Sequence, residues 1–126
     1  MTPRGFHHVA IQVRDVEKVT AFYVRVLGLP EVKRFHRDDG SLRSVWVNAG
    51  EGAAFFAIED APAHTPAGAL GFSMVALRID ASARAAVIEE LTRAGVAIEK
   101  QSGWTVYVRD PEGNLVGLSH HPEPAP

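Results

Sequence analysis

An internal repeat limits the possible folds of this chain more than any other feature. His8–Gly28 ("HVAIQVRDVEKVTAFYVRVLG") and Met74–Gly95 ("MVALRIDASARAAVIEELTRAG") each begin with alternating apolar and polar residues and continue with apolar residues at helical spacing. Each stretch contains an Asp suited to capping a helix and closes on a Gly. Two copies of one strand–helix unit within 126 residues predict two tandem modules in one small domain.

Three short strand-like runs follow each of the two helices. The first set lies at about 31–36, 42–48 and 53–59, and the second at about 96–100, 104–109 and 115–119. Gly and Asp turns separate these runs. The order βαβββ–βαβββ predicts an α+β fold that forms a single domain over residues 1–126. Within it we expect module one at about 5–59, a linker at about 60–71, module two at about 72–121 and a Pro-rich tail at 122–126.

The composition excludes several classes of function. The chain has no Cys, which rules out disulfides, thiolate metal sites and thiol catalysis. Its net charge of −2, without any run of Lys and Arg, predicts neither a nucleic-acid partner nor an anionic membrane partner. The N-terminus lacks the apolar segment of a signal peptide, and no stretch approaches membrane-spanning length. We therefore expect a cytoplasmic protein.

Three stretches of the sequence carry a family resemblance. They are "HHVAIQVRDVEKVTAFYVRVLGL", "GFSMVALRID" and "VYVRDPEGNLVGLSHH". In this order and spacing the chain resembles the vicinal oxygen chelate superfamily, which contains glyoxalase I, extradiol dioxygenases and bleomycin-resistance proteins. The resemblance implies paired βαβββ modules whose curved mixed sheets form a cleft. It also implies a divalent metal, which many members hold there with His and Glu side chains.

Strand parity predicts which side chains face such a cleft, because alternate residues of a strand point to opposite faces. One parity class is apolar and should pack against the helices: Val9, Ile11 and Val13, with Val75, Leu77 and Ile79 in the repeat. The other class should line the cleft: His8, Ala10 and Gln12, with Met74, Ala76 and Arg78 in the repeat.

The metal site that the resemblance implies is incomplete in this sequence. The family's first His matches His8, its second His falls at Met74, and its closing Glu falls at Gly117. A remaining acidic position falls at either Ala57 or Glu59. Divalent metals of the Zn, Ni, Fe or Mn kind need about three or more protein N/O donors. We expect no metal bound in the family manner and no cofactor, since only a vestigial pair, His8 and Glu59, is left for weak divalent binding.

Two classes of function stay open. The first is a bleomycin-resistance-like protein that binds a small organic molecule in a cleft of mixed apolar and polar character. The second is an enzyme of the glyoxalase or dioxygenase kind: a metal-dependent lyase or dioxygenase using His8 and Glu59, or a metal-free isomerase with His8 as catalytic base. The ligand contacts expected in either case share the cleft-facing parity: His8, Gln12, Phe55, Glu59, Met74, Arg78 and Gly117. Relatives commonly pair, so we also expect a homodimer.

Some side chains have two interpretations. Trp46 is an apolar cleft candidate, and either Trp104 or Tyr107 joins it, according to the parity of their strand. Arg78 would hold an anionic group of the ligand or form a salt bridge to Glu59 or another acid. His120 and His121 follow the last strand, and we expect both to be exposed tail residues.

Overall fold

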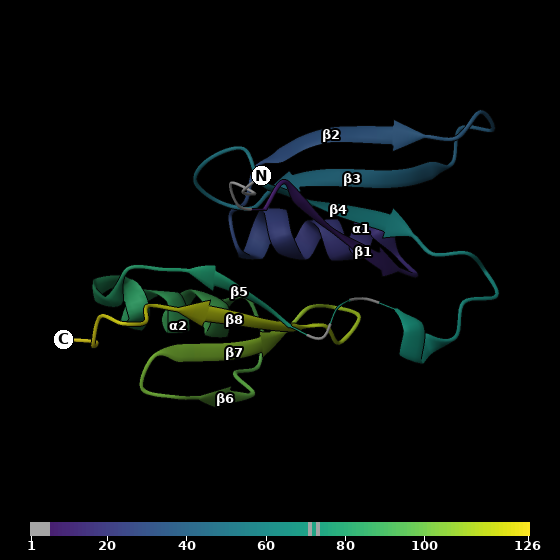
Figure 1. Ribbon diagram of the computed structural model, residues 1–126. Coiled ribbons are helices and arrows are strands. Elements are labelled where there is room, and N and C mark those ends of the chain that lie inside the picture. The colour runs from purple at the N-terminus through teal and green to yellow at the C-terminus, as the bar shows by residue number, and fades with distance from the viewer. Residues whose placement is uncertain (1–5, 71, 73) are drawn as a thin grey trace, which may run out of the picture. The chain divides into compact units, whose positions relative to one another are not determined.

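The structure is a computed structural model that describes residues 6–70, 72 and 74–126. The chain divides into two compact units, Met1–Gly71 and Phe72–Pro126. Each unit contains a four-stranded mixed sheet and an α-helix, which Figure 1 shows along the chain. The expected α+β fold of two modules is confirmed.

The first unit contains the first strand–helix repeat and three further strands. Its elements are β1 (His8–Val13), α1 (Val16–Ala21), the π-helical η1 (Phe22–Val26), β2 (Glu31–His36), β3 (Leu42–Asn48), β4 (Phe55–Asp60) and the 3₁₀ turn η2 (Ala67–Ala69). The strand order is β1-β4-β3-β2, in which β1 and β4 run parallel and the other pairs antiparallel. Helix α1 contacts β3 and β4, so it covers one face of this sheet (Figure 1).

The second unit repeats this strand order with shorter strands and a longer α-helix. Its elements are β5 (Val75–Arg78), the 3₁₀ turn η3 (Ala81–Ala83), α2 (Arg84–Arg93), β6 (Lys100–Gln101), β7 (Thr105–Arg109) and β8 (Leu115–Ser119), and the strand order is β5-β8-β7-β6. The strand expected at about 96–100 is displaced, because only Lys100 and Gln101 pair with β7. One further hydrogen bond, from the Glu99 N–H to the Tyr107 carbonyl at 2.8 Å, extends this contact.

The two predicted helix caps have different outcomes. The Asp15 carboxylate accepts a hydrogen bond from the Lys18 N–H at 3.0 Å, so the first cap is confirmed. The Asp80 side chain makes no capping bond, and the prediction is wrong there. The reason is the 3₁₀ turn that follows Asp80, since it moves the N-cap position of α2 to Ala83.

Both helices end at the predicted glycines. Gly28 has a φ of +72° and Gly95 a φ of +76°, the left-handed conformation that favours Gly after a helix. The first helix differs from the expectation in its last turn, which is π-helical over Phe22–Val26. There the Leu27 N–H reaches back five residues to the Phe22 carbonyl at 3.1 Å.

The apolar parity class contributes less to the core than predicted, because Val9, Val75, Leu77 and Ile79 are only half-buried. Ile11 and Val13 are fully buried on β1, and the Tyr23 ring lies 5.5 Å from the Phe56 ring between helix and sheet. The buried apolar residues of the second unit come from α2, β7 and β8: Leu91, Val106, Val108, Val116 and Leu118. No helix in the described ranges has the length and apolar character needed to cross a membrane.

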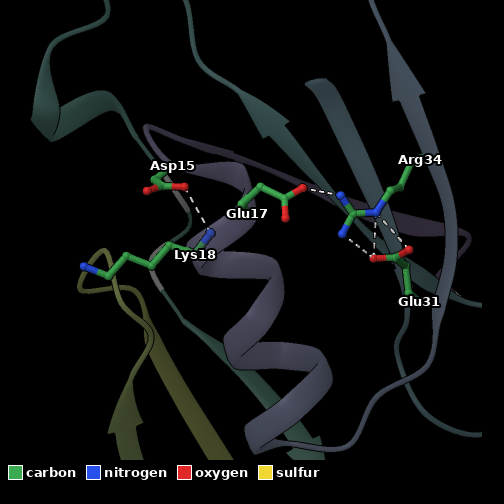
Figure 2. A network of polar contacts seen from close by, with 5 residues as sticks. All are labelled: Asp15, Glu17, Lys18, Glu31 and Arg34. Carbon is green, nitrogen blue, oxygen red and sulfur yellow. Dashed lines mark hydrogen bonds and ion pairs between the residues drawn. The ribbon is translucent and has the colours of Figure 1, made fainter. Parts of the chain in front are cut away.

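A charged cluster joins α1 to the edge strand β2, as Figure 2 shows. The Arg34 guanidinium forms an ion pair with Glu31 at 2.8 Å on its own strand and with Glu17 on α1. The hydrogen bonds from Arg34 hold the pKa of the Glu31 carboxyl below its ordinary value. Because the cluster is partly exposed, its contribution to stability is small compared with that of the core.

Two polar contacts hold the segments that follow the sheets. In the linker, the Arg14 guanidinium donates to the backbone carbonyls of Pro62, at 3.0 Å, and Thr65. Beyond β8, His120 is only 3% exposed, so the expectation of an exposed His120 is wrong, whereas His121 is exposed as predicted. The His120 ring contacts the Arg84 guanidinium through Nε2, at 2.9 Å, and the Glu123 carbonyl through Nδ1, which fixes the start of the tail.

Candidate functional site

The face of the first sheet opposite α1 gathers four of the predicted site residues. The parallel register sets His8 beside Phe55 and Gln12 beside Glu59. Since residues directly opposite each other in register share a face, all four point away from the α1 side. We call this surface the open face of the first sheet.

A row of four rings crosses the open face from β1 to β2. Following the row, the His8 and Phe55 ring centroids lie 5.0 Å apart with planes 10° apart, and the Phe55 and Trp46 centroids lie 4.3 Å apart with planes 27° apart. The Phe35 ring follows, 4.7 Å from Trp46 and tilted by 52°. We call these four residues, His8, Phe55, Trp46 and Phe35, the aromatic row. His8 is exposed and the other three are half-buried, so the row is part of the surface.

Two cations lie over the Phe35 end of the aromatic row. The Lys33 Nζ is 5.0 Å from the Phe35 ring centroid, and the Arg43 guanidinium carbon is 5.6 Å from it. Both distances suit cation–π attraction. Two irregularities in the β2–β3 register produce this arrangement, because they leave Val32 and Arg43 as extra residues between paired positions.

The His8 end of the row carries a second histidine. The Nδ1 atoms of His7 and His8 lie 2.9 Å apart, close enough for one ring to donate a hydrogen bond to the other. The His7 ring also meets Phe55 edge-on, with centroids 5.6 Å apart. His8 is therefore held on both sides, by the stacked Phe55 and by the His7 nitrogen.

The second sheet has a different open face, made of smaller side chains. The register sets Gly117 between Ala76 and Tyr107, and the exposed Arg78 pairs with Ser119. The parity left open by the sequence is thereby decided: Tyr107 shares the face of Gly117, whereas Val106 is fully buried on the other side. Trp104 precedes β7 and contacts His120 and His121 instead.

Gly117 lies under a neighbouring side chain. A Cβ at this position would be 3.1 Å from Thr105 Cγ2 and 3.6 Å from Ala76 Cβ. The Thr105 hydroxyl donates to Ser119 Oγ at 2.9 Å, which fixes the side chain that carries this methyl group. The space beside Gly117 is therefore partly filled by Thr105.

The register also decides which residue of β4 matches the closing position of β8. In the second sheet Gly117 pairs with Ala76, and in the first sheet Ala57 pairs with Ala10, the repeat partner of Ala76. Ala57, and not Glu59, thus occupies the position equivalent to Gly117.

The donor set does not fit the family's metal. Glu59 lies opposite Gln12, four residues from His8, so the two backbone positions are about 13 Å apart along the strands. Side chains that stand upright on a sheet do not converge on one ion over such a distance. Within the described residues, no three or more His, Asp or Glu side chains gather closely enough to hold a metal.

Comparison with known proteins identifies the family. The model of the Glyoxalase/Bleomycin resistance protein/Dioxygenase superfamily matches residues 5–118. The chain therefore belongs to this superfamily, the one that its sequence resembles. No curated protein sequence matches the chain significantly.

Solved structures show the same fold. A lactoylglutathione lyase from Agrobacterium tumefaciens is 24% identical, with 96% of each chain covered and a TM-score of 0.73. TnmS3, an antibiotic binding protein from a Streptomyces species, is also 24% identical, with 95% of this chain and 98% of its own covered and a TM-score of 0.73. A genomically encoded fosfomycin resistance protein, FosX, from Listeria monocytogenes is 19% identical, with 94% and 93% covered and a TM-score of 0.72. At these identities the likeness concerns the fold alone.

The sequence predicted part of this site and missed the rest. Trp46 and Phe55 were apolar candidates, but Phe35, Lys33 and Arg43 were not. A signal existed in "EVKRFH", where Lys33 and Phe35 share a parity class. Arg43 had no such signal, since only the register irregularity turns it towards Phe35.

Proposed function

We propose that this protein binds a small organic molecule on the open face of its first sheet, without a metal held in the family manner. The aromatic row carries the proposal. Four rings in contact, three of them half-buried and the His8 ring exposed, run across four strands and form a largely apolar surface bordered by polar groups. Such surfaces suit small ligands, which bind through apolar contacts and are oriented by a few polar anchors.

The predicted contacts on this sheet keep their proposed roles. His8 and Phe55 would contact the ligand through their rings, and Gln12 and Glu59 through their polar groups. On the second sheet, Met74, Arg78 and Gly117 remain predicted ligand contacts, although Thr105 limits the room beside Gly117.

An enzymatic role has less support from the residues present. The lyase and dioxygenase alternatives require His8 and Glu59 to serve one metal, and the register sets them at different ends of the β1–β4 pair. The isomerase alternative requires His8 as a base, and it stays open, because the contact with His7 involves Nδ1 and leaves Nε2 for a proton. Binding is the function that the geometry favours.

Binding of a neutral planar aromatic, methyl naphthoate, tests the proposal. We expect Trp46→Leu to weaken its binding about 10–100-fold, because the variant removes the largest ring of the row. Trp104→Leu is the matched control, since Trp104 lies outside the row, and it should leave the affinity unchanged. Isothermal titration calorimetry provides the affinities.

Metal analysis tests whether the protein binds its ligand without a metal. Protein purified without a His tag should contain less than stoichiometric Zn, Ni, Fe or Mn, and EDTA should leave methyl naphthoate binding unchanged. A tight one-to-one metal complex that is lost in a His8→Ala variant would contradict the proposal and favour the enzyme. Equal binding by the wild type and Trp46→Leu would remove the aromatic row as the binding surface.

We also propose that the protein is a cytoplasmic homodimer. Two-fold homodimers are the commonest oligomers, and relatives in this superfamily commonly pair. The Arg14 contacts fix residues 62 and 65 of the linker to the first unit, which leaves a shorter free segment for an exchange of modules between chains. Light scattering should give the mass of two chains, and a monomer mass at high micromolar concentration would contradict the proposal.

A further inference from the structure

We infer that the ligand is a planar aromatic molecule with an anionic group, and that Lys33 and Arg43 bind this group beside the aromatic row. The inference rests on the proposed function and names the chemical class of its ligand. Two independent properties of the open face support it: the orientation of the rings and the balance of charge.

The His8, Phe55 and Trp46 rings face one another, whereas the Phe35 ring is tilted by 52° and contacts Lys33 and Arg43. Near-parallel rings with centroids 4.3 to 5.0 Å apart must overlap face to face, because rings lying flat side by side would collide at that distance. Their edges are then left for a ligand. Ring edges carry the positive part of the aromatic quadrupole, so they attract the face of an electron-rich ring or an anionic oxygen.

The charged side chains at the Phe35 end of the aromatic row also favour an anionic ligand group. Lys33 and Arg43 are exposed, and neither has a carboxylate partner within the part of the chain that the structure describes. The neighbouring arginines differ, since Arg34 is paired with Glu17 and Glu31, and Arg37 with Asp60 at 2.9 Å. Two unpaired cations over one ring form a place for a carboxylate, sulfonate or phosphate.

One acidic residue on the open face opposes an anion. Glu59 pairs in register with Ser44, which in turn pairs with Phe35. The face therefore has two cations and one carboxylate near the Phe35 end, and the balance favours an anionic group placed next to Lys33 and Arg43. The Glu59 carboxylate should repel an anionic ligand. Removal of its charge should therefore strengthen the binding of an anion, whereas removal of the Lys33 and Arg43 charges should weaken it.

Naphthoate and its methyl ester are suitable probes, since they share the planar ring and differ in charge. We expect calorimetry at low salt to show naphthoate binding about tenfold more tightly than the ester. The double variant Lys33→Gln/Arg43→Gln should abolish this preference by weakening naphthoate binding about tenfold, a much larger loss than for the uncharged ester. Glu59→Gln should increase the preference for naphthoate, and added salt should reduce it.

A matched control exists in the second unit. Lys100 Nζ lies 4.8 Å from the Tyr107 ring centroid, a similar cation–π contact away from the aromatic row, so Lys100→Gln should leave both affinities unchanged. Circular dichroism establishes that each variant is folded, which is expected because Lys33, Arg43 and Lys100 are exposed and Glu59→Gln keeps the size of a half-buried side chain.

The possible failures are distinguishable. If naphthoate binds no more tightly than the ester, or keeps its preference in the Lys33→Gln/Arg43→Gln variant, the inference is wrong. In that case ester binding that still requires Trp46 leaves the proposed function intact. If neither probe binds, or neither requires Trp46, the proposed function is wrong as well.

Discussion

The variant Ile11→Ala should lower the free energy of unfolding by about 2–5 kcal/mol, the range for truncating a large buried aliphatic side chain. Ile11 has no exposed surface and lies on the face of β1 that α1 covers. Shortening it leaves a cavity beside Ile58, the fully buried residue that pairs with Ile11 on β4, and a close-packed core fills such a cavity only partially. Urea titration followed by circular dichroism measures the change.

The adjacent residue is the matched control for this prediction. Gln12 is exposed on the open face, so Gln12→Ala should change the free energy of unfolding by less than about 0.5 kcal/mol. Two neighbouring residues on one strand should therefore differ severalfold in their effect on stability. Similar losses in both variants would mean that β1 does not present alternate residues to the core and to the open face.

The variant Gly117→Leu should destabilise the second unit by about 1–3 kcal/mol through overpacking, without any ligand present. The added Cβ would meet Thr105 Cγ2 at 3.1 Å, and the hydrogen bond from Thr105 to Ser119 opposes a shift of that methyl group. Gly103→Leu is the control, since a Cβ at Gly103 meets nothing within 4 Å. Its effect should stay below about 0.5 kcal/mol.

A second substitution tests whether Thr105 is the cause. Thr105→Ser removes Cγ2 but keeps the hydroxyl that bonds Ser119, so it should relieve the clash. In a double-mutant cycle the two changes should be coupled by about 1 kcal/mol or more. If Gly117→Leu leaves stability unchanged, or Thr105→Ser does not relieve its effect, Thr105 does not limit the space beside Gly117.

Local sequence patterns were enough to predict some features of the structure. The alternation of Val9, Ile11 and Val13 with His8 and Gln12 correctly predicted the two faces of β1, because side-chain direction along a strand depends only on neighbouring residues. The same holds for Gly28 and Gly95, where the backbone conformation is decided within one helical turn. The repeat of these local patterns was enough to predict the α+β fold and its two modules.

Properties that depend on strand pairing could not be predicted in this way. The choice between Ala57 and Glu59 as the equivalent of Gly117 requires the register of β4 against β1, which the sequence leaves ambiguous by two residues. The contact of Arg43 with Phe35 requires an irregularity between β2 and β3. Both features depend on how two strands pair, and the residues of one strand alone do not determine that pairing.

The sequence by itself thus determined the order of the elements and the core face of β1. Only the tertiary structure joined His8, Phe55, Trp46 and Phe35 into one row and buried His120 against Arg84. The physical reason is the range of the interactions. Periodicity and turn conformation are set within a few residues, whereas ring contacts and burial are set by partners from distant parts of the chain.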